Sequence, residues 1–438
     1  MNKLVCRCGA PCPNLDLFRT RNVATSPKRL ASLPSLAHLR VLAAVAQHGS
    51  ATRAAAALFR AQSAVTRSIR EIEQALGEPL LERRATGMVP TAVGRAVLDR
   101  NARVFGELED LASWCAAGQP RARTAVVPTV PSYLLNTRRL QLLVALARHR
   151  HMPTAAHALG ISQPAVSAAI RILESGAGFP LFDRTTSGLQ PTEAGEQFVL
   201  QVRRALNELR HIPDDIAAVK GSIRGQVVVG GLPFARTRIL PEAVARVSRS
   251  HPGVRVVTDE SAYEILAADL RAGDVDFIFG GLRAADMASG FRSERLMSEA
   301  MVVLARSDHP LAASRGLALA RLGRQQWILP RAHTPARTIL DDVFARARVR
   351  TPEPAVETAD LAMIRGLLLR TDMLAILPAQ QLHYECQTGS LAVLDIALPG
   401  TERDIGLTLR TTGEPSPAAR TLIEAIRGVV AEMAAAAT

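Results

Sequence analysis

The N-terminal half carries, at two places, polar and basic side chains of the kinds that contact DNA. Gln62 and Gln163 each offer an amide whose donor and acceptor match the edge of an adenine. Arg83 and Arg184 suit backbone phosphates, with an ion pair to a nearby carboxylate as the alternative. The candidate DNA contacts are Gln62, Ser63, Thr66, Arg67, Arg70, Arg83, Gln163, Pro164, Ser167, Arg171 and Arg184.

Residues for catalysis or metal binding form no complete set. The chain has no Gly-x-Ser-x-Gly elbow, no His-Glu-x-x-His and no phosphate-binding loop. Cys6, Cys8 and Cys12 lie close together without a nearby His, which leaves a metal site incomplete. We expect a flexible tail there, with metal or redox sensing as the alternative. The sequence therefore predicts no enzyme, no cofactor and no metal.

The second group of DNA-binding candidates lies in a helix-turn-helix pattern. Apolar residues recur at helical spacing in three short runs between Arg139 and Glu174. Gly160 ends the second run, because glycine takes the left-handed conformation of a helix C-terminus. Pro164 suits the first turn of the third helix, which is the one that enters a DNA major groove.

A wing and a long helix follow. Residues 179–184 are extended, 185–188 form a turn and 189–191 return. Thr192 then caps a long helix that we expect to reach about Val219, with Pro213 interrupting it.

Four segments carry a resemblance to a known family: Ser-Gln-Pro-Ala-Val-Ser at 162–167, Leu-Glu at 173–174, Leu-Phe-Asp-Arg at 181–184 and Gly-Leu-Gln-Pro-Thr-Glu-Ala-Gly at 188–195. They resemble the LysR-type transcriptional regulators. The resemblance implies a DNA-binding winged helix-turn-helix whose linker helix pairs antiparallel with its twin. A helical core module without DNA contact is the alternative.

The same module occurs a second time. An offset of 101 residues aligns Leu39–Gly94 with Leu140–Gly195 without a gap and matches the turn, third helix, wing and cap. The first copy departs from the pattern because Phe59 replaces Gly160 and Ser63 replaces Pro164. Its third helix carries more arginine, so copy one is expected to hold phosphates more than it reads bases.

The duplication suggests an internal pseudo-dimer. The long helices, from Ala92 to about Cys115 and from Glu193 onward, would pack against each other within one chain. A dimer of chains would then carry four modules, as many as a usual tetramer of the family.

Charge separates the two halves of the chain. Residues 1–224 contain 29 Lys and Arg against 16 Asp and Glu, whereas the remainder contains 24 of each. The whole excess of +13 therefore lies with the helix-turn-helix copies, where it attracts a polyanion in a salt-dependent way. An Arg-rich composition alone would not leave the second half neutral.

From Gly225 the pattern alternates between strands and helices. Strands are expected at 226–231, 254–258 and 275–279, which indicates a parallel sheet. Gly231-Leu-Pro, Ile239-Leu-Pro and His251-Pro-Gly are among the motifs similar to the effector-binding domain of LysR-type regulators. The resemblance implies a periplasmic-binding-protein-like (type 2) fold of two α/β lobes, and the branch containing regulators of galactose-binding protein and of aromatic-acid catabolism.

Ligands of such sheets bind at the C-terminal ends of the strands, between the lobes. Hydroxyls and helix N-termini there suit a small anion such as a carboxylate. Aromatic residues are few, which favours an organic or aromatic acid over a sugar, although a sugar remains open. The candidate effector contacts are Pro233, Phe234, Ala235, Arg236, Ser261, Tyr263, Gly281, Arg283, Thr334, Pro335 and Thr358.

The expected fold is multidomain: two α-rich winged helix-turn-helix modules followed by a two-lobed α/β domain. The boundaries are a tail at 1–34, copy one at 35–118, a linker at 119–135, copy two at 136–220 and the effector domain at 221–438, with lobe crossings near 300–304 and 377–394.

These features predict a bacterial, sequence-specific transcription regulator that is controlled by a small-molecule effector. The expected partners are double-stranded promoter or operator DNA, the effector, further copies in a homodimer or homotetramer, and RNA polymerase. No membrane segment or signal peptide is evident, so a cytoplasmic location is expected. The alternatives are a constitutive DNA-bridging architectural protein and a solute-binding protein with vestigial N-terminal modules.

Overall fold

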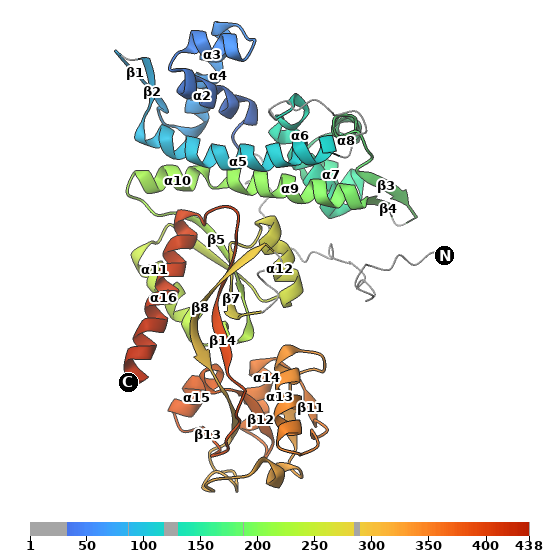
Figure 1. Ribbon diagram of the computed structural model, residues 1–438, viewed down its shortest axis with the longest axis vertical. Coiled ribbons are helices and arrows are strands. Elements are labelled where there is room, and N and C mark those ends of the chain that lie inside the picture. The colour runs from blue at the N-terminus through green and yellow to red at the C-terminus, as the bar shows by residue number, and fades with distance from the viewer. Residues whose placement is uncertain (1–32, 86, 118–129, 187, 284–289, 438) are drawn as a thin grey trace. The chain divides into compact units, whose positions relative to one another are not determined.

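The chain divides into two compact units, Met1–Gly221 and Ser222–Thr438 (Figure 1). The computed structural model describes residues 33–85, 87–117, 130–186, 188–283 and 290–437. The N-terminal segment with Cys6, Cys8 and Cys12 lies outside the described residues, as does most of the expected linker between the copies.

Unit 1 contains two winged helix-turn-helix modules, as the sequence predicts. The first comprises α2 (Leu36–His48), α3 (Ala51–Ala57), α4 (Gln62–Leu76), β1 (Leu81–Arg84), β2 (Gly87–Pro90) and α5 (Ala92–Ala117). The second comprises η1 (Ser132–Leu134), α6 (Thr137–His149), α7 (Met152–Ala158), α8 (Gln163–Ala177), β3 (Phe182–Thr185), β4 (Gly188–Pro191), α9 (Glu193–Arg210) and α10 (Ile212–Val219).

Local chemistry explains these boundaries in both modules. The hydroxyl of Thr192 accepts from the backbone N–H of Gly195 at 2.9 Å, which confirms the expected cap of α9. Pro213 follows the break between α9 and α10, so the interruption that the sequence predicts is also confirmed. Glu73 and Glu174 occupy equivalent positions, and each carboxylate accepts from the first backbone N–H groups of its own wing.

The two modules share one hydrophobic core, in which α5 lies beside α9 (Figure 1). Arg103 approaches Glu208 at 3.8 Å, and Arg204 approaches Glu107 at 3.9 Å. The offset of 101 converts Arg103 and Glu107 into Arg204 and Glu208, so each contact is the counterpart of the other. The arginine of each helix faces the glutamate of the other, which requires the two helices to run in opposite directions. Unit 1 is therefore an antiparallel pseudo-twofold pair, as the pseudo-dimer hypothesis requires.

The pseudo-twofold relationship extends to the start of each module. The backbone N–H of Leu36 donates to the hydroxyl of Thr137 at 3.0 Å, and these residues are also 101 apart. That hydroxyl donates in turn to the carbonyl of Pro34 at 3.0 Å.

Unit 2 consists of two lobes. The sheet of lobe 1 has the order β6-β5-β7-β14-β8, and the sheet of lobe 2 has the order β11-β10-β12-β9-β13. Lobe 1 contains β5 (Gly225–Gly231), η2 (Pro233–Arg236), α11 (Ile239–Ser250), β6 (Val254–Asp259), α12 (Tyr263–Ala272), β7 (Phe277–Gly281), β8 (Phe291–Glu299), β14 (Arg403–Arg410) and α16 (Pro417–Ala437). Lobe 2 contains β9 (Met301–Arg306), η4 (Leu319–Leu322), β10 (Trp327–Leu329), α13 (Pro335–Arg346), β11 (Val356–Glu357), α14 (Leu361–Leu368), β12 (Leu374–Pro378), η5 (Ala379–Leu382), α15 (His383–Gln387) and β13 (Leu391–Val393).

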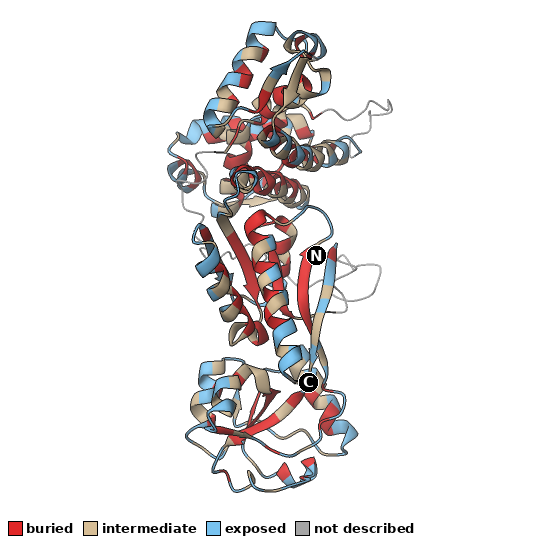
Figure 2. Ribbon diagram, turned by 90° about the vertical axis from the view of Figure 1, so that its left-hand side faces the viewer, coloured by how far each residue is buried: buried red, intermediate tan, exposed pale blue. Residues whose placement is uncertain are grey.

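The core of each lobe lies on both faces of its sheet. In lobe 1, α11 and α16 cover one face and α12 covers the other. In lobe 2, α13 and α14 take the corresponding positions. Figure 2 shows buried residues along the strands of each sheet, flanked by helices that bury only one side.

Strand pairing confirms one expectation about unit 2 and corrects another. β5 runs parallel to β6 and β7, as the sequence predicts. The sheets as a whole are mixed, because β14 runs antiparallel to both β7 and β8, and β12 runs antiparallel to β9. The return to lobe 1 was expected near 377–394, but β13 still pairs with β9 inside lobe 2. The chain therefore crosses back only between Val393 and Arg403, whereas the first crossing falls between Glu299 and Met301.

Among the described residues, the structure has no helix of the length and apolarity needed to cross a membrane.

Candidate nucleic-acid interface and effector site

The third helix of each module exposes the face on which the candidate DNA contacts lie. On α4, Val65 and Ile69 are buried against the core, whereas Gln62 and Arg70 are exposed. On α8, Gln163, Pro164 and Arg171 are exposed, and Ser167 is half-buried, like Thr66 on α4. Amphipathic spacing thus presents the expected side chains together on one side of each helix.

An ion pair changes the charge expected on α4. The Arg67 Nε donates to the Glu71 carboxylate at 2.7 Å, and His38 approaches the same carboxylate at 3.2 Å. The hydrogen bond from Arg67 lowers the pKa of Glu71, which therefore stays ionised. Glu71 neutralises part of the positive charge that the sequence analysis assigned to copy one.

The wing arginines are exposed on the two-stranded hairpins. Arg83 pairs with Met88 in the β1–β2 register, and Arg184 pairs with Leu189 in the β3–β4 register. Neither guanidinium makes an ion pair with any described residue, although Arg84, next to Arg83 on β1, contacts Glu82 at 2.5 Å. The ion-pair alternative for Arg83 and Arg184 is therefore not observed in the part of the chain that the structure describes.

The candidate effector residues of unit 2 divide into two groups. Phe234 and Ala235 are buried in the core of lobe 1, so their side chains pack against it. The hydroxyl of Thr334 caps α13 by accepting from Arg337, and the hydroxyl of Thr358 accepts from the backbone N–H of Asp360 at 3.1 Å. Pro335 is exposed in the first turn of α13, and Pro233, Arg236 and Ser261 are half-buried.

The remaining candidates gather around two arginines at the end of β7. The guanidinium carbon of Arg283 lies 4.7 Å from the ring centre of Tyr263, which is a cation–π contact. The Arg403 guanidinium lies against Gly281, where a Cβ atom would approach its Nη2 to 2.9 Å. Burial, and secondarily the positive charge of Arg283, lowers the pKa of Arg403.

Arg403 is a residue that the sequence analysis missed. Among the described residues, its guanidinium makes no hydrogen bond or ion pair, and it sits beside a second cation. Two neighbouring cations with no carboxylate beside Arg403 form a setting that a small anion would stabilise. In sequence, Arg403 is separated from Gly281 by the whole of lobe 2, so strand spacing alone gave no signal for it.

A second missed residue, Gln380, links the lobes. Its carbonyl accepts from the hydroxyl of Thr237 at 3.2 Å, and its side-chain oxygen accepts from Arg238 at 2.9 Å. Its backbone N–H donates to Glu299, whose pKa is nevertheless raised because burial outweighs that bond. Gln380 thus joins three residues of lobe 1 to lobe 2.

A cavity of about 500 Å³ lies where the starts of α2 and α6 meet, between the two modules of unit 1. Arg60, Arg138 and Arg139 contribute to its lining. Arg138 donates to the carbonyl of Leu159, and Arg139 donates to the carbonyl of Tyr133 at 3.0 Å. These two guanidinium groups hold the backbone of copy two.

The exposed third helices and wings, joined to a two-lobed α/β unit, define a DNA-binding regulator with an effector domain. Comparison with known families supports this class. The model of the bacterial regulatory helix-turn-helix protein, lysR family, matches twice, at 36–95 and 137–196, and the LysR substrate binding domain matches 220–431. Both ends of the two helix-turn-helix matches differ by the offset of 101.

Individual relatives agree. The HTH-type transcriptional regulator GalR of Pseudomonas putida is 50% identical over 402 residues, which cover 92% of this chain and 99% of the relative. The HTH-type transcriptional regulator PcaQ of Agrobacterium fabrum is 30% identical over 298 residues, 68% of this chain and 95% of the relative. A full-length variant of OxyR from Pseudomonas aeruginosa has the same fold at 24% identity and a TM-score of 0.50, covering 68% of this chain and 94% of that one.

The chain therefore belongs to the LysR family of transcription regulators, with a duplicated helix-turn-helix module. It is a DNA-binding transcription regulator with an effector-binding domain rather than an enzyme. Regulators of this family bind DNA and small-molecule effectors and form oligomers. Among the described residues, no group of three or more His, Cys, Asp or Glu side chains is arranged to hold a metal ion.

Proposed function

We propose that the protein controls transcription from promoter DNA in response to a small organic acid. The acid binds in unit 2 beside Arg283 and Arg403, and DNA binds to the exposed faces of α4, α8 and the two wings. The observation that carries the choice of ligand is the pair of arginines, because Arg403 lacks a counter-ion among the described residues.

The arginine pair favours an acid over a sugar. A carboxylate accepts two parallel hydrogen bonds from a guanidinium and neutralises part of its charge, whereas a neutral sugar leaves both charges in place. Tyr263 stacks on Arg283 and so holds that guanidinium beside the proposed site. An aromatic ring attached to the carboxylate would find a flat neighbour in Tyr263.

The two modules have different roles in the proposal. In copy two, α8 presents Gln163 exposed and Ser167 half-buried, with Arg171 donating to the Ser167 hydroxyl at 3.2 Å, and this copy reads base edges. In copy one, Arg60 and Arg70 are exposed while Arg67 is held by Glu71, so this copy mainly holds phosphates. Arg83 and Arg184 contact the backbone from the wings.

The location and the partners complete the proposal. We place the protein in the cytoplasm, where bacterial promoters and RNA polymerase are found, as a homodimer or homotetramer. Binding of the acid shifts the balance between arrangements of the lobes, and the oligomer carries that shift to the DNA.

The test measures binding of the full chain to its own upstream DNA, and its thermal stability, with organic acids and with neutral sugars. We expect one acid to raise the melting temperature and alter the footprint, and Arg403→Gln to abolish both effects. Arg295→Gln is the matched control, because this exposed arginine of β8 already pairs with Asp404 at 2.9 Å. A response to a sugar but to no acid would overturn the proposal that the effector is an acid. Tight DNA binding without any response would favour the architectural protein instead.

A further inference from the structure

The contact between the two modules has symmetric and asymmetric parts. We infer that copy one pairs specifically with copy two of the same chain and excludes pairing of like copies between chains. Each chain then presents a complete DNA-binding head with two unequal halves. That this head binds DNA rests on the proposed function, but the pairing of the two modules can be tested without DNA.

The symmetric part does not select a partner. Arg103 faces Glu208 as Arg204 faces Glu107, and these four residues are two equivalent pairs under the 101-residue offset. Two first copies, or two second copies, would reproduce the same arginine–glutamate contacts. Selection must therefore come from positions at which the copies differ.

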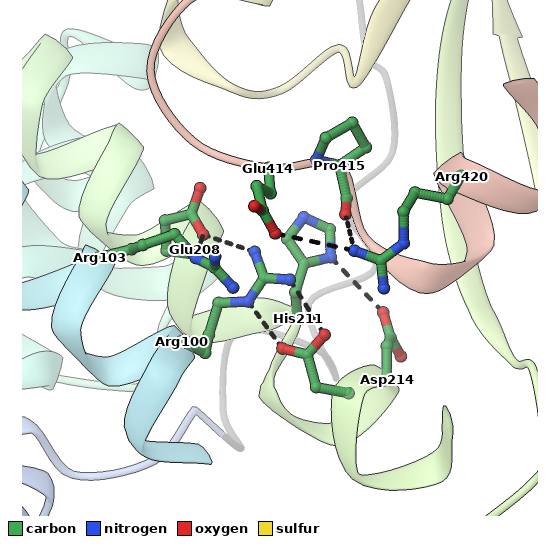
Figure 3. Close-up of polar contacts among 9 residues, drawn as sticks. Arg100, Arg103, Glu208, His211, Asp214, Glu414, Pro415 and Arg420 are labelled. Atoms are coloured by element: carbon green, nitrogen blue, oxygen red, sulfur yellow. Dashed lines mark hydrogen bonds and ion pairs between the residues drawn. The ribbon is translucent and has the colours of Figure 1, made fainter. Parts of the chain in front are cut away.

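Arg100 is the first such position. Its side chain is fully buried, and Figure 3 shows it extending from α5 to Glu208 of the neighbouring helix. Its Nη1 lies 2.6 Å from the Glu208 carboxylate, and its Nε and Nη2 lie 2.7 and 3.0 Å from the two carboxylate oxygens of Asp215. Burial disfavours the charged guanidinium, but hydrogen bonds from Arg100 to Asp215 and the charge of Glu208 outweigh it and raise the pKa of Arg100.

A pair of two first copies and a pair of two second copies would each break this cluster. The 101-residue offset aligns Arg100 with Gln201 and Asp215 with Trp114, although α5 continues through Trp114 whereas α9 ends at Arg210, before Asp215. Two second copies would leave Asp215 without the guanidinium that it now binds and Glu208 with only the longer arginine contact. Two first copies would place Trp114 where Arg100 requires Asp215. A buried charge that loses its partner is strongly unfavourable, so both like pairings are penalised.

The two ends of the helix pair differ in the same sense. At one end, the rings of Trp114 and Phe179 meet edge to face with centres 5.4 Å apart. At the other end, Lys220 forms an ion pair with Glu78, which is the equivalent of Phe179. Two first copies would bring Trp114 against Glu78, and two second copies would bring Lys220 against Phe179. Pairing of copy one with copy two therefore forms favourable contacts at both ends of the helix pair, whereas pairing of two like copies forms them at neither end.

A crosslinking experiment tests pairing within one chain. Cysteines replace Glu107 and Arg204, which face each other outside the Arg100 cluster, in the full chain with its native cysteines substituted. We expect a short bismaleimide to link the double variant, Glu107→Cys with Arg204→Cys, without doubling its mass on a denaturing gel. Two differently tagged chains that carry one cysteine each are co-expressed as the control. A strong interchain product from that mixture would overturn pairing in cis and reveal exchange of modules between chains.

A second experiment tests the role of Arg100. A Glu107→Cys chain and an Arg103→Cys chain are co-expressed, because these positions face each other across chains only if two first copies pair. With Arg100 present we expect at most a trace of crosslinked product. After Arg100→Gln in both chains we expect its yield to rise at least tenfold, since this change gives copy one the short amide side chain found in copy two. Arg95→Gln is the matched control, because Arg95 is an exposed arginine of α5 whose guanidinium, among the described residues, donates only to the carbonyl of Pro90.

The outcomes are distinguishable. Selection by Arg100 is refuted if Arg100→Gln produces no interchain crosslink while the Glu107→Cys/Arg204→Cys chain that also carries Arg100→Gln still forms its intrachain product. Loss of the intrachain product without any interchain product would point to unfolding of the Arg100→Gln variant, and the first experiment then decides the proposal. Neither experiment includes DNA, so a failure of the proposed function would leave both results interpretable.

Discussion

Phe59 and Gly160 occupy equivalent positions in the turns of the two modules, and both have left-handed backbone with φ of 51° and 64°. Glycine takes this conformation without strain, whereas a residue with a Cβ atom is strained by about 1–2 kcal/mol. The turn of copy one is therefore kept by the surrounding helices although its sequence opposes it. Phe59 is also 96% exposed, so its ring contributes no burial in return.

Phe59→Gly should stabilise the protein by about 1 kcal/mol, because the substitution removes the strain and loses no buried surface. The measurement is the midpoint of denaturant unfolding of the full chain, followed by a signal that reports unit 1. Gly160→Ala is the matched control. Its new Cβ would meet no atom within 4 Å, so strain alone should destabilise copy two by about 1 kcal/mol. Equal, unchanged stabilities for both variants would contradict the strain.

Local signals in the sequence predicted most of unit 1. The turn glycine, the capping threonine and the Pro213 break each act within one turn of the chain, so spacing alone located the helices and the wing. Pairing of α5 with α9 followed from the duplication. Arg100 was not predicted, because its role depends on Asp215, more than 100 residues away in sequence.

Prediction was weaker in unit 2 because its site is built by distant segments. Gly281 and Arg283 lie at the expected strand end, but Arg403 reaches them from β14 after the chain has passed through all of lobe 2. Phe234, a candidate effector contact, is buried in the core of lobe 1. A position at a strand end identifies a region, and only three-dimensional neighbours show which side chains face outward there.

Substitutions in the second module should separate affinity from specificity. Arg184→Ala should weaken binding to all DNA sequences and reduce the magnitude of the salt-dependence slope by about 1, because one phosphate contact is lost. Gln163→Ala should cost about 1–3 kcal/mol on the operator and little on random DNA, because a base contact is lost. Titration of operator and random duplexes at several salt concentrations measures both. Identical behaviour of the two variants would refute the division between phosphate and base contacts.

Two glutamates of β8 should respond to pH in opposite directions. Burial raises the pKa of Glu299, so the native state binds more protons than the unfolded state. Its stability contribution is complete below the unfolded value of about 4.5 and is lost as the pH rises through the folded pKa. Glu299→Gln should therefore stabilise unit 2 at pH 7 and have little effect at pH 4.

Glu294 is the internal control for that measurement. The hydrogen bond from Arg427 lowers the pKa of Glu294, so its contribution is present above about pH 4.5 and is lost as the pH falls through the folded pKa. Glu294→Gln should destabilise unit 2 at pH 7 and have little effect in acid. Unfolding free energies at pH 4, 5, 6 and 7 would show the two variants diverging from wild type with opposite signs, and parallel shifts would contradict the assignment.

Gly281→Ala should weaken binding of the acid effector while the fold stays intact. The new Cβ would approach the Arg403 Nη2 to 2.9 Å, and the end of a flexible side chain can move aside at little cost to the fold. Displacement of Arg403 from Arg283 should raise the Kd of the acid about tenfold, which corresponds to about 1.4 kcal/mol. Gly231→Ala is the matched control, because its Cβ would meet Arg236 only at 3.4 Å. Calorimetric titration of both variants with the acid identified on the wild type measures the effect. Equal affinities for Gly281→Ala and Gly231→Ala would remove Arg403 from the site, since only the first substitution moves that guanidinium.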